Sequence, residues 1–200
     1  MPKKRRAFKR PLGERRYRKI FVIAVEGAKT EPQYFAIFND RNSVIRVACV
    51  KGKHRSSPPQ VLKRMDDYLT KECLKDSDEA WLVVDKDNWS DEQLSQLYAW
   101  SEGCDCYGLA LSNPKFEYWL LLHFEDGTGV QTSRACSDRL KRYLPNYAKG
   151  IDPRDFTQAR VRDAVRRAEA RDVPPCSDWP RTTGTTVYRL VEKLLREDHE

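Results

Sequence analysis

Two apolar runs, each followed at once by acidic residues, constrain the fold of this chain more than any other feature. Residues 20–25 precede Glu26, and residues 80–84 precede Asp85 and Asp87. Short apolar runs rich in β-branched residues are typical of strands buried on both faces, as in a parallel sheet covered by helices. Ligands of such sheets bind beyond the carboxyl ends of the strands. The pattern therefore predicts that the three carboxylates meet at one edge of a parallel sheet.

Predicted strands and helices alternate through the first half of the chain. Strands are expected at residues 20–25, 44–50, 80–84 and 107–111, and helices at residues 30–38, 58–74 and 91–100. Thr30 is expected to cap the first helix. Ser56 or Ser57 is expected to cap the second, which has Pro58 in its first turn. Strands separated by helices imply right-handed crossovers and a mostly parallel sheet flanked by helices, so the predicted class is α/β.

The second half is predicted to be helical. Asn113 is expected to cap a helix over residues 114–124, which is apolar almost all round and should be buried. Beyond the glycines at residues 127–129, charged helices are expected at residues 137–143, 156–171 and 186–196. The predicted organisation is a basic disordered arm at residues 1–19, an α/β core at residues 20–126, and a C-terminal helical extension at residues 127–200 packed on the core.

Positive charge is concentrated in the arm. Residues 1–19 contain ten Lys or Arg against one Glu, a net charge of +9, whereas the rest of the chain has 27 basic and 29 acidic residues. Such a block is typical of a tail that contacts nucleic acid or an acidic partner, and a tail that only aids solubility has the same composition. The candidate nucleic-acid contacts in the arm are Lys3, Lys4, Arg5 and Arg6.

Cysteine usage and hydropathy exclude several classes of protein. The six cysteines show no repeated pair with the spacing of a zinc site, and the basic start lacks the apolar stretch of a signal peptide. No apolar run approaches the roughly 20 residues that a membrane-spanning helix needs. These features predict a soluble, cytoplasmic protein with reduced cysteines and no contact with a membrane.

Glu26, Asp85 and Asp87 form a candidate metal site. Three carboxylates at one place repel each other unless a divalent cation neutralises them. Mg²⁺ prefers such hard oxygen ligands, with water and phosphate completing its shell, and Mn²⁺ is the alternative ion. Acidic residues after strands can also simply cap the following helices. For Glu31 this capping role is the preferred interpretation.

This arrangement resembles the Toprim domain, the α/β fold of topoisomerases, primases and overcoming-lysogenization-defect nucleases, which has a Glu after its first strand and an Asp-x-Asp after its third. More specifically, the chain resembles the RloB family, whose relatives include the abortive-infection AbiL system. The matching segments are Glu26-Gly27-x-Lys29-Thr30-Glu31, Val84-Asp85-Lys86-Asp87, the long run from Ser112 to Phe124, and Thr183-Gly184-Thr185-Thr186.

The resemblance implies a Mg²⁺-dependent, Toprim-like nuclease that cuts phosphodiester bonds in DNA or RNA as an effector of phage defence, in abortive infection or in restriction-linked loci. It also implies a partner ATPase of the AAA or ABC type, encoded nearby. Asp85 and Asp87 would hold the metal, Glu26 would be a general base or a second metal ligand, and Lys29 would stabilise developing charge. One alternative is a non-catalytic subunit that binds a nucleotide or nucleic acid while the ATPase does the work. Another is a purely structural adaptor of a defence complex.

Glu117 is a charged residue in a predicted helix of apolar residues, so its carboxylate is expected to have a partner or a function. A buried carboxylate requires a metal, a cation or hydrogen-bond donors. Glu117 is therefore either a catalytic or metal-binding group or half of an ion pair. The candidate partners are Lys86, Lys115 and Lys29. His123 in the same segment is more consistent with a core residue than with a catalyst.

Three further segments carry candidate phosphate contacts. Lys29 follows Glu26 at a helix start, where exposed amides favour phosphate. The loop at residues 51–55 supplies Lys53 and Arg55, although a solvated basic loop explains the same residues. Residues 181–186 could hold an anion with their amides and hydroxyls, or could simply cap the last helix.

Overall fold

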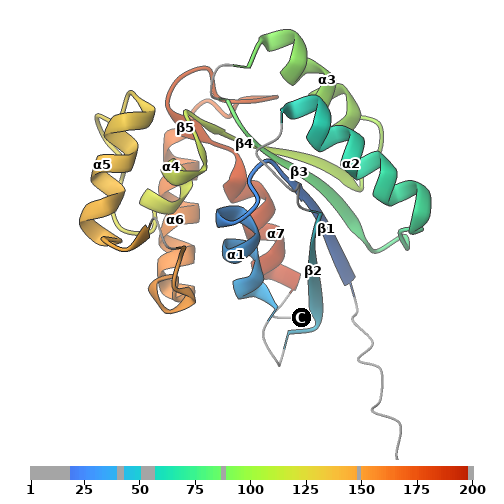
Figure 1. Ribbon diagram of the computed structural model, residues 1–200, viewed down its shortest axis with the longest axis horizontal. Coiled ribbons are helices and arrows are strands. Elements are labelled where there is room, and N and C mark those ends of the chain that lie inside the picture. Colours follow the sequence, from blue (N-terminus) through green and yellow to red (C-terminus); the bar gives the residue numbers. More distant parts are fainter. Residues whose placement is uncertain (1–18, 40–42, 51–56, 87–88, 148–149, 198–200) are drawn as a thin grey trace, which may run out of the picture.

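The structure is a computed structural model, shown in Figure 1, and it describes residues 19–39, 43–50, 57–86, 89–147 and 150–197. Seven of the predicted functional residues lie outside these ranges: Lys3, Lys4, Arg5, Arg6, Lys53, Arg55 and Asp87. What the sequence predicts for them stays a prediction.

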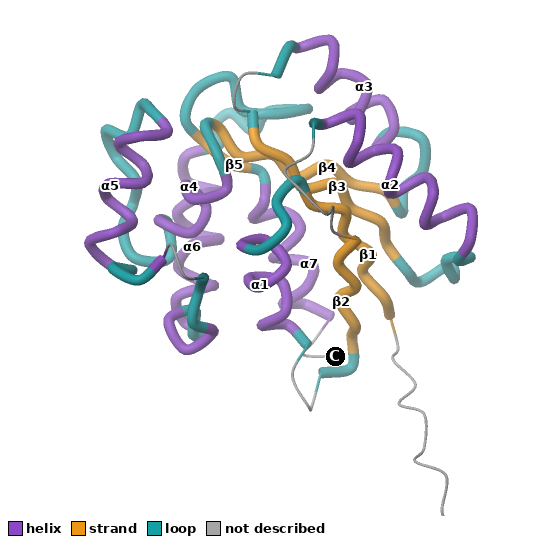
Figure 2. The backbone as a smooth tube through the Cα atoms, viewed as in Figure 1, coloured by secondary structure: helices purple, strands orange, loops and turns teal. Residues whose placement is uncertain are grey.

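Within the described residues, five strands form one sheet in the order β2-β1-β3-β4-β5. They are β1 (Lys19–Val25), β2 (Ile45–Val50), β3 (Glu79–Asp85), β4 (Tyr107–Asn113) and β5 (Gly184–Thr185). The first four are parallel, and β5 runs antiparallel to β4. This confirms the predicted α/β class with its mostly parallel sheet, drawn in orange in Figure 2. The sequence does not predict β5, because two residues are too short to carry a strand pattern.

Helices cover both faces of the sheet (Figure 1). On one face lie α2 (Pro58–Lys71) and α3 (Asp91–Ser101), and on the other lie α1 (Thr30–Phe35), α4 (Phe116–Leu121), α6 (Gln158–Arg171) and α7 (Val187–Glu197). The helix α5 (Ser133–Tyr143) packs outside α4, and short 3-10 helices are formed by Ala36–Phe38 and Pro153–Asp155. No helix within the described ranges is long and apolar enough to cross a membrane.

The central strands are buried on both faces, which explains their uninterrupted apolar sequences. Side chains alternate along β1, so Phe21, Ile23 and Val25 enter the larger core under α1, α4 and α7. Val22 and Ala24 enter the smaller core under α2 and α3. Burial of a large apolar side chain stabilises a fold by about 1.5–3 kcal/mol. Both helical layers therefore contribute to holding the sheet.

The starts of two helices test the predicted caps. Ser57 is the N-cap of α2, its amide donates to Gln60 Oε1 at 3.0 Å, and Pro58 follows in the first turn, as predicted. Thr30 does not cap α1, because it is already the first helical residue and Lys29 is the N-cap.

The prediction that Asn113 caps the next helix is wrong. Asn113 is the last residue of β4, where it pairs with Gly184, and its peptide bond to Pro114 is cis. Its pairing with Gly184 keeps Asn113 in the sheet, and α4 begins at Phe116 with the extended Lys115 as its N-cap. The helix is therefore shorter than predicted and starts after the turn.

Residues beyond 127 contact the rest of the chain through the sheet and the larger core. The strand β5 extends the sheet beside β4, and buried side chains of α6 and α7 share the larger core with β1. Lys19 at the start of β1 forms an ion pair with Glu197 at the end of α7, at 2.9 Å. The segment is thus packed on the α/β part, while its status as a separate unit stays a prediction.

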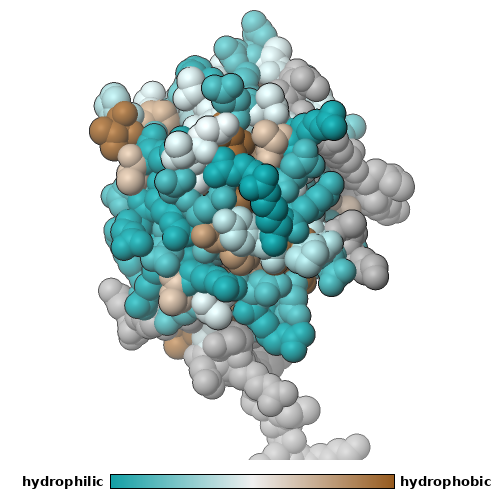
Figure 3. Space-filling model, turned by 90° about the vertical axis from the view of Figure 1, so that its left-hand side faces the viewer, coloured by the Kyte–Doolittle hydropathy of each residue, from teal (hydrophilic) through white to brown (hydrophobic). Residues whose placement is uncertain are grey.

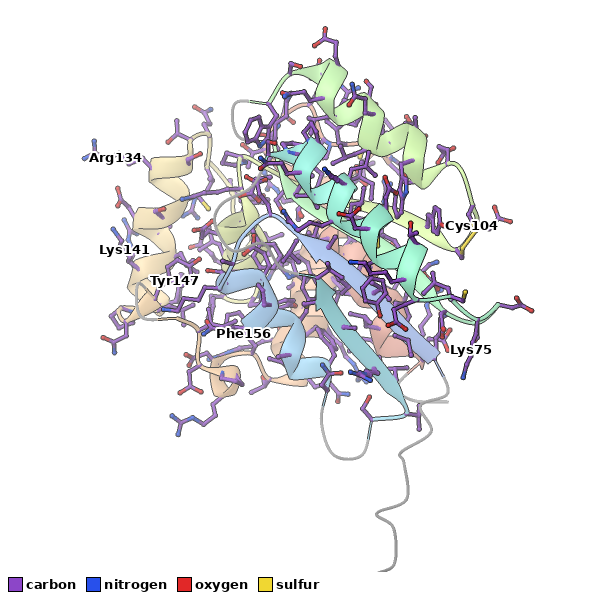
Figure 4. The ribbon with its side chains drawn as sticks, turned by 45° about the vertical axis from the view of Figure 1, so that its right-hand side comes forward. Lys75, Cys104, Arg134, Lys141, Tyr147 and Phe156 are labelled. Atoms are coloured by element: carbon purple, nitrogen blue, oxygen red, sulfur yellow. A yellow bond between two sulfur atoms is a disulfide. The ribbon has the colours of Figure 1, made fainter. Side chains whose placement is uncertain are left out.

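Cys104 and Cys106 form a disulfide in the turn before β4. The expectation that all cysteines are reduced is wrong for this pair. The other cysteines, all within the described ranges, are free. The pair lies at the amino ends of the strands, where Figure 4 shows Cys104 far from Tyr147.

We expect Gly108→Ala to destabilise the protein by about 1–3 kcal/mol, because a β-carbon at this position of β4 would lie 2.6 Å from the Trp81 ring. Trp81 cannot move away freely, since its indole nitrogen donates to Glu79 Oε2 at 2.9 Å. Chemical denaturation measures the change. In a Trp81→Phe background the same substitution should cost less, and equal costs in both backgrounds would contradict the steric explanation.

Candidate functional site

The carboxyl ends of β1 and β3 flank the point where the strand order reverses. In the chain, β1 leads to β2 on one side of the sheet centre, and β3 leads to β4 on the other side. Such a point opens a crevice, which is the usual ligand site of an open α/β sheet. A cleft of about 350 Å³ lies there. We call it the acidic cleft, and it is lined by Glu26, Gly27, Ala28, Lys29, Thr30, Glu31, Asp85, Lys115, Phe116, Glu117 and Tyr147.

Glu26 and Asp85 meet in the acidic cleft. The parallel register places Val25 beside Val83, and the Glu26 amide donates to the Val83 carbonyl oxygen at 3.1 Å. The Asp85 amide donates to Glu26 Oε2 at 3.2 Å, and Glu26 is almost fully buried. The structure thus brings two of the three predicted ligands together, whereas Asp87 lies outside the described residues.

The Asp85 carboxyl group sits where its charged form is disfavoured. Burial raises its pKa well above the usual range, and the negative charges of Glu31, Glu26 and Glu117 raise it further. One contact opposes this shift, because the Phe116 amide donates to Asp85 Oδ1 at 2.7 Å. A cation bound in the cleft would favour the charged form and lower the pKa again.

Glu31 is a further carboxylate of the cleft, so its interpretation as a helix cap is incomplete. It is 6% exposed, and its Oε1 accepts a hydrogen bond from the Gly27 amide at 2.9 Å. A β-carbon at Gly27 would lie 2.2 Å from Glu31 Oε2, so any other residue at this position would displace the Glu31 carboxylate. The sequence held a signal for this position, because side chains in the first turn of a helix point back towards the preceding strand end.

Glu117 enters the cleft from α4, with 21% of its side chain exposed. The Tyr147 hydroxyl donates to Glu117 Oε1 at 3.0 Å, and Lys115 Nζ lies 3.8 Å from the same oxygen. Another predicted partner, Lys86, instead forms an ion pair with Asp91 at 2.6 Å. Glu117 therefore faces the cleft with one hydrogen-bond donor and one cation beside it.

Tyr147 is a cleft residue that the sequence does not indicate. It lies beyond α5, in the predicted helical extension, and points towards α1 (Figure 4). Its hydroxyl oxygen is 3.2 Å from Thr30 Oγ1. Burial raises its pKa, and the charge of Glu117 raises it further. A single tyrosine in a loop carries no motif, so only the tertiary structure places it here.

Three cations stand near the carboxylates. Lys29, the predicted phosphate contact, lines the cleft from an exposed position. Lys115 is tied to α5, because its Nζ donates to Ser137 Oγ at 2.6 Å. Arg64 of α2, which the sequence does not indicate, donates to the backbone carbonyl oxygen at the end of β1 at 2.6 Å and interacts with the Glu26 charge.

His123 belongs to the core and not to the cleft. It is 2% exposed, its Nδ1 lies 3.0 Å from the Trp119 carbonyl oxygen, and its Nε2 lies 3.1 Å from the Tyr34 hydroxyl. Burial lowers its pKa to about 3, so it stays neutral at physiological pH. The interpretation of His123 as a core residue is confirmed.

The donor set of the acidic cleft suits a hard divalent cation. Its carboxylates present only oxygen atoms, which are the ligands that Mg²⁺ and Mn²⁺ accept. Among the residues that the structure describes, no three His, Cys, Asp or Glu side chains are grouped as a metal site. Asp87 is not among those residues, and the third predicted ligand would come from it.

A larger cavity, of about 630 Å³, lies at the opposite edge of the sheet. It is lined by residues that precede β3 and β4, among them Lys75 and Cys104, which Figure 4 places on the far side from Tyr147. Ligands of open α/β sheets bind at the carboxyl ends of the strands and not at the amino ends. The acidic cleft is therefore the better candidate although it is smaller.

Comparison with known protein families bears on this cleft. Residues 21–194 match the family of RloB-like proteins. The chain belongs to the RloB-like family. A search of curated proteins and a search of solved structures found no match. The matched range of this RloB-like protein contains every residue that lines the acidic cleft, and the resemblance to the RloB family inferred from the motifs is confirmed.

We expect Asp85→Asn to stabilise the metal-free protein at neutral pH. A raised pKa means that the folded state binds this proton more tightly than the unfolded state, so ionisation of Asp85 lowers stability as the pH rises above the usual value of 3.8. Asparagine removes the charge and keeps an oxygen for the Phe116 amide. Thermal unfolding over a range of pH measures the difference, which should shrink as the pH falls towards the usual aspartate pKa.

The control is Asp91→Asn, which should have the opposite sign. A hydrogen bond from Lys86 lowers the pKa of Asp91, so its charged form stabilises the fold above that pKa. Loss of stability at neutral pH in Asp85→Asn would contradict the proposed repulsion among the carboxylates of the cleft.

Proposed function

We propose that this RloB-like protein is a Mg²⁺-dependent nuclease that hydrolyses phosphodiester bonds in nucleic acid. The observation that carries the proposal is the contact of Glu26 with Asp85 at the strand ends, with Glu31 and Glu117 in the same cleft. Carboxyl groups with a raised pKa in a cleft are frequent at functional sites. Mn²⁺ is expected to replace Mg²⁺, because both accept oxygen ligands.

Each residue of the cleft has a proposed role. A bound Mg²⁺ would orient the phosphate, activate water and neutralise charge on the leaving oxygen. Asp85 and Asp87 would hold it. Glu26 would act as a general base or as a second metal ligand, and Glu117 would assist as a further base or ligand. Lys29 would stabilise the negative charge that develops on the phosphate.

The biological part of the proposal rests on family membership. The chain belongs to the RloB-like family, and its sequence motifs resemble those of Toprim nucleases and of the abortive-infection AbiL system. We therefore propose that it acts in the cytoplasm as a phage-defence effector, in abortive infection or beside a restriction system. Its partner would be an ATPase of the AAA or ABC type encoded nearby, and its substrate would be DNA or RNA.

We expect most of the attraction of nucleic acid to come from outside the acidic cleft, because carboxylates repel phosphates. The contacts proposed in the arm and the basic loop lie outside the described residues: Lys3, Lys4, Arg5, Arg6, Lys53 and Arg55. The described surface around α5 and α6 is mostly hydrophilic (Figure 3), and Arg134 and Lys141 point outwards from α5 (Figure 4). Exposed cations on such a surface suit a polyanion.

The second candidate function is a non-catalytic subunit that binds a nucleotide or nucleic acid while a partner ATPase does the work. The observation that favours it concerns the described residues, in which no three potential ligands are grouped as a metal site. Metal binding then depends on Asp87. Without that contribution, the cleft would hold a ligand through Lys29, Lys115 and Tyr147 and would not cut it.

Cleavage assays separate the two functions. Labelled DNA and RNA are incubated with the full chain in the presence and absence of Mg²⁺ or Mn²⁺, alone and together with the ATPase encoded nearby. Cleavage that requires the metal supports the nuclease. Binding of nucleic acid without cleavage in every combination would support the non-catalytic subunit.

We expect Asp85→Ala and Asp87→Ala each to lower metal-dependent cleavage by about 100-fold or more, the lower range of what positioned catalytic groups contribute. The melting temperature of Asp85→Ala should stay equal or rise, because the substitution removes repulsion among carboxylates. The matched control is Asp105→Ala, at an exposed position beside the disulfide on the opposite edge. Full activity in either site variant would contradict the metal role.

We expect Glu117→Gln to lower activity strongly and stability little. Glutamine keeps the size and an acceptor for the Tyr147 hydroxyl but removes the charge. If Glu117 is instead half of a buried ion pair, the same change should destabilise by about 3–5 kcal/mol. Melting temperature and activity measured on one variant separate the two roles, with Glu169→Gln on the exposed face of α6 as control.

A further inference from the structure

A second cavity lies at the same edge of the sheet as the acidic cleft, beyond the end of β4. It has a volume of about 170 Å³ and is lined by the end of α6, the bend after it and the loop that leads into β5. Its position follows from Asn113, the last residue of β4, which pairs with Gly184 and donates from its side chain to the Pro180 carbonyl oxygen at 3.0 Å. We call it the loop cavity.

Both carboxylate oxygens of Asp172, which lines the loop cavity, already accept hydrogen bonds from the protein. Asp172 Oδ1 accepts from the Cys176 amide at 2.9 Å. Asp172 Oδ2 accepts from the Tyr188 hydroxyl at 2.9 Å and from Arg189 Nη2 at 2.8 Å. Burial raises the pKa of the Cys176 thiol to about 11, so the thiol adds no negative charge. The wall therefore presents no unneutralised anion to a ligand.

Other residues that line the loop cavity have hydrogen-bond donors that remain available. Arg181 uses one contact to Asp178 Oδ2, at 2.6 Å, and one to the Trp179 carbonyl oxygen, at 3.2 Å. A guanidinium has five N–H donors, so donors are left over. The hydroxyls of Thr182 and Thr183 make no hydrogen bond to any other residue in the described part of the chain. A ligand of this cavity must therefore be rich in acceptors.

The loop that carries these donors is held in place before any ligand binds. Trp179 is 2% exposed and anchors the loop in the core beneath α3, and the Arg181 guanidinium lies 4.1 Å from the centre of its ring. At Gly184, where the loop enters β5, a β-carbon would lie 3.0 Å from Pro180 Cβ. The loop is therefore packed tightly against Pro180, with little room for a side chain at position 184. A preorganised site loses less conformational freedom on binding.

Size and charge select the ligand. Cavities that enclose a drug-sized molecule have about 300–1,000 Å³, so the loop cavity is large enough for a single anionic group and too small for a nucleoside. Arginine with neighbouring hydroxyls matches the geometry and the charge of phosphate.

We propose that the loop cavity binds a phosphate group of a nucleic-acid strand whose reacting phosphate lies in the acidic cleft. The phosphate site rests on Arg181, Thr182 and Thr183 alone, whereas the identity of the strand rests on the proposed nuclease function. Both sites lie at the carboxyl edge of the sheet: Gly184 of the loop cavity pairs with Asn113 at the end of β4, and Lys115 and Phe116, just after β4, line the acidic cleft. One strand can therefore pass over both.

The phosphate site is tested by amide NMR on the full chain, titrated with inorganic phosphate. The amide resonances of Thr182, Thr183 and Gly184 should shift together in the wild type. Arg181→Gln should weaken binding by about tenfold, as expected for loss of a charged hydrogen bond. Arg166→Gln, an exposed arginine on α6, is the control and should bind as the wild type does.

Two further variants keep this test decisive if Arg181→Gln disturbs the loop. Arg181→Lys keeps the charge and loses the fork of donors, so it should bind with intermediate affinity. Thr182→Val with Thr183→Val removes the hydroxyls and should also weaken binding. Shifts scattered over the surface, or shifts at the loop that no variant changes, would overturn the phosphate site.

A short single-stranded oligonucleotide, added to the Asp85→Asn variant, tests whether the phosphate belongs to nucleic acid. The same loop amides should shift at lower concentration than with inorganic phosphate, and Arg181→Gln should weaken this binding about tenfold. Shifts with inorganic phosphate but not with the oligonucleotide would overturn the nucleic-acid assignment. Failure of the nuclease function would appear separately, as absence of metal-dependent cleavage in a protein whose loop still binds phosphate.

Discussion

The parallel pairing of β1 with β3 is the constraint on which the site depends. Its register sets Val25 beside Val83, so both chains leave the sheet at the same level and the Asp85 amide reaches Glu26. Burial of both strand faces resists any shift of this register, because a slip by one residue would exchange the side chains that fill the two cores. The strands that follow in the chain, β2 and β4, lie on opposite sides of the β1–β3 pair. The crevice between the carboxyl ends of β1 and β3 therefore stays accessible.

Within that crevice the carboxylates oppose one another, and backbone amides offset part of the cost. The Gly27 amide donates to Glu31, the Asp85 amide to Glu26, and the Phe116 amide to Asp85. Hydrogen bonds to a charged acceptor are stronger than neutral ones, yet the pKa of Asp85 is still raised. Local rules are most often violated at functional sites. A divalent cation would remove the remaining repulsion, and the proposed metal-dependent function rests on this expectation.

The part of the chain after residue 127 completes the carboxyl edge of the sheet. Tyr147 holds Glu117 from one side, and Ser137 of α5 accepts the hydrogen bond that fixes Lys115. The loop before β5 adds Arg181 and a second cavity beyond β4. This part of the chain therefore contributes walls to both cavities, and a truncated chain that ends at residue 126 would lack them.

The sequence by itself determined the α/β class, the four parallel strands and the nearness of Glu26 to Asp85, because apolar runs and their acidic ends are local patterns with a known place in a sheet. It misplaced the start of α4, since pairing of Asn113 with Gly184 depends on a segment far along the chain. Only the tertiary structure decided that Arg64 and Tyr147 stand near these carboxylates. Their contacts are made across long sequence separations, and no local pattern encodes which distant side chain will fill a given space.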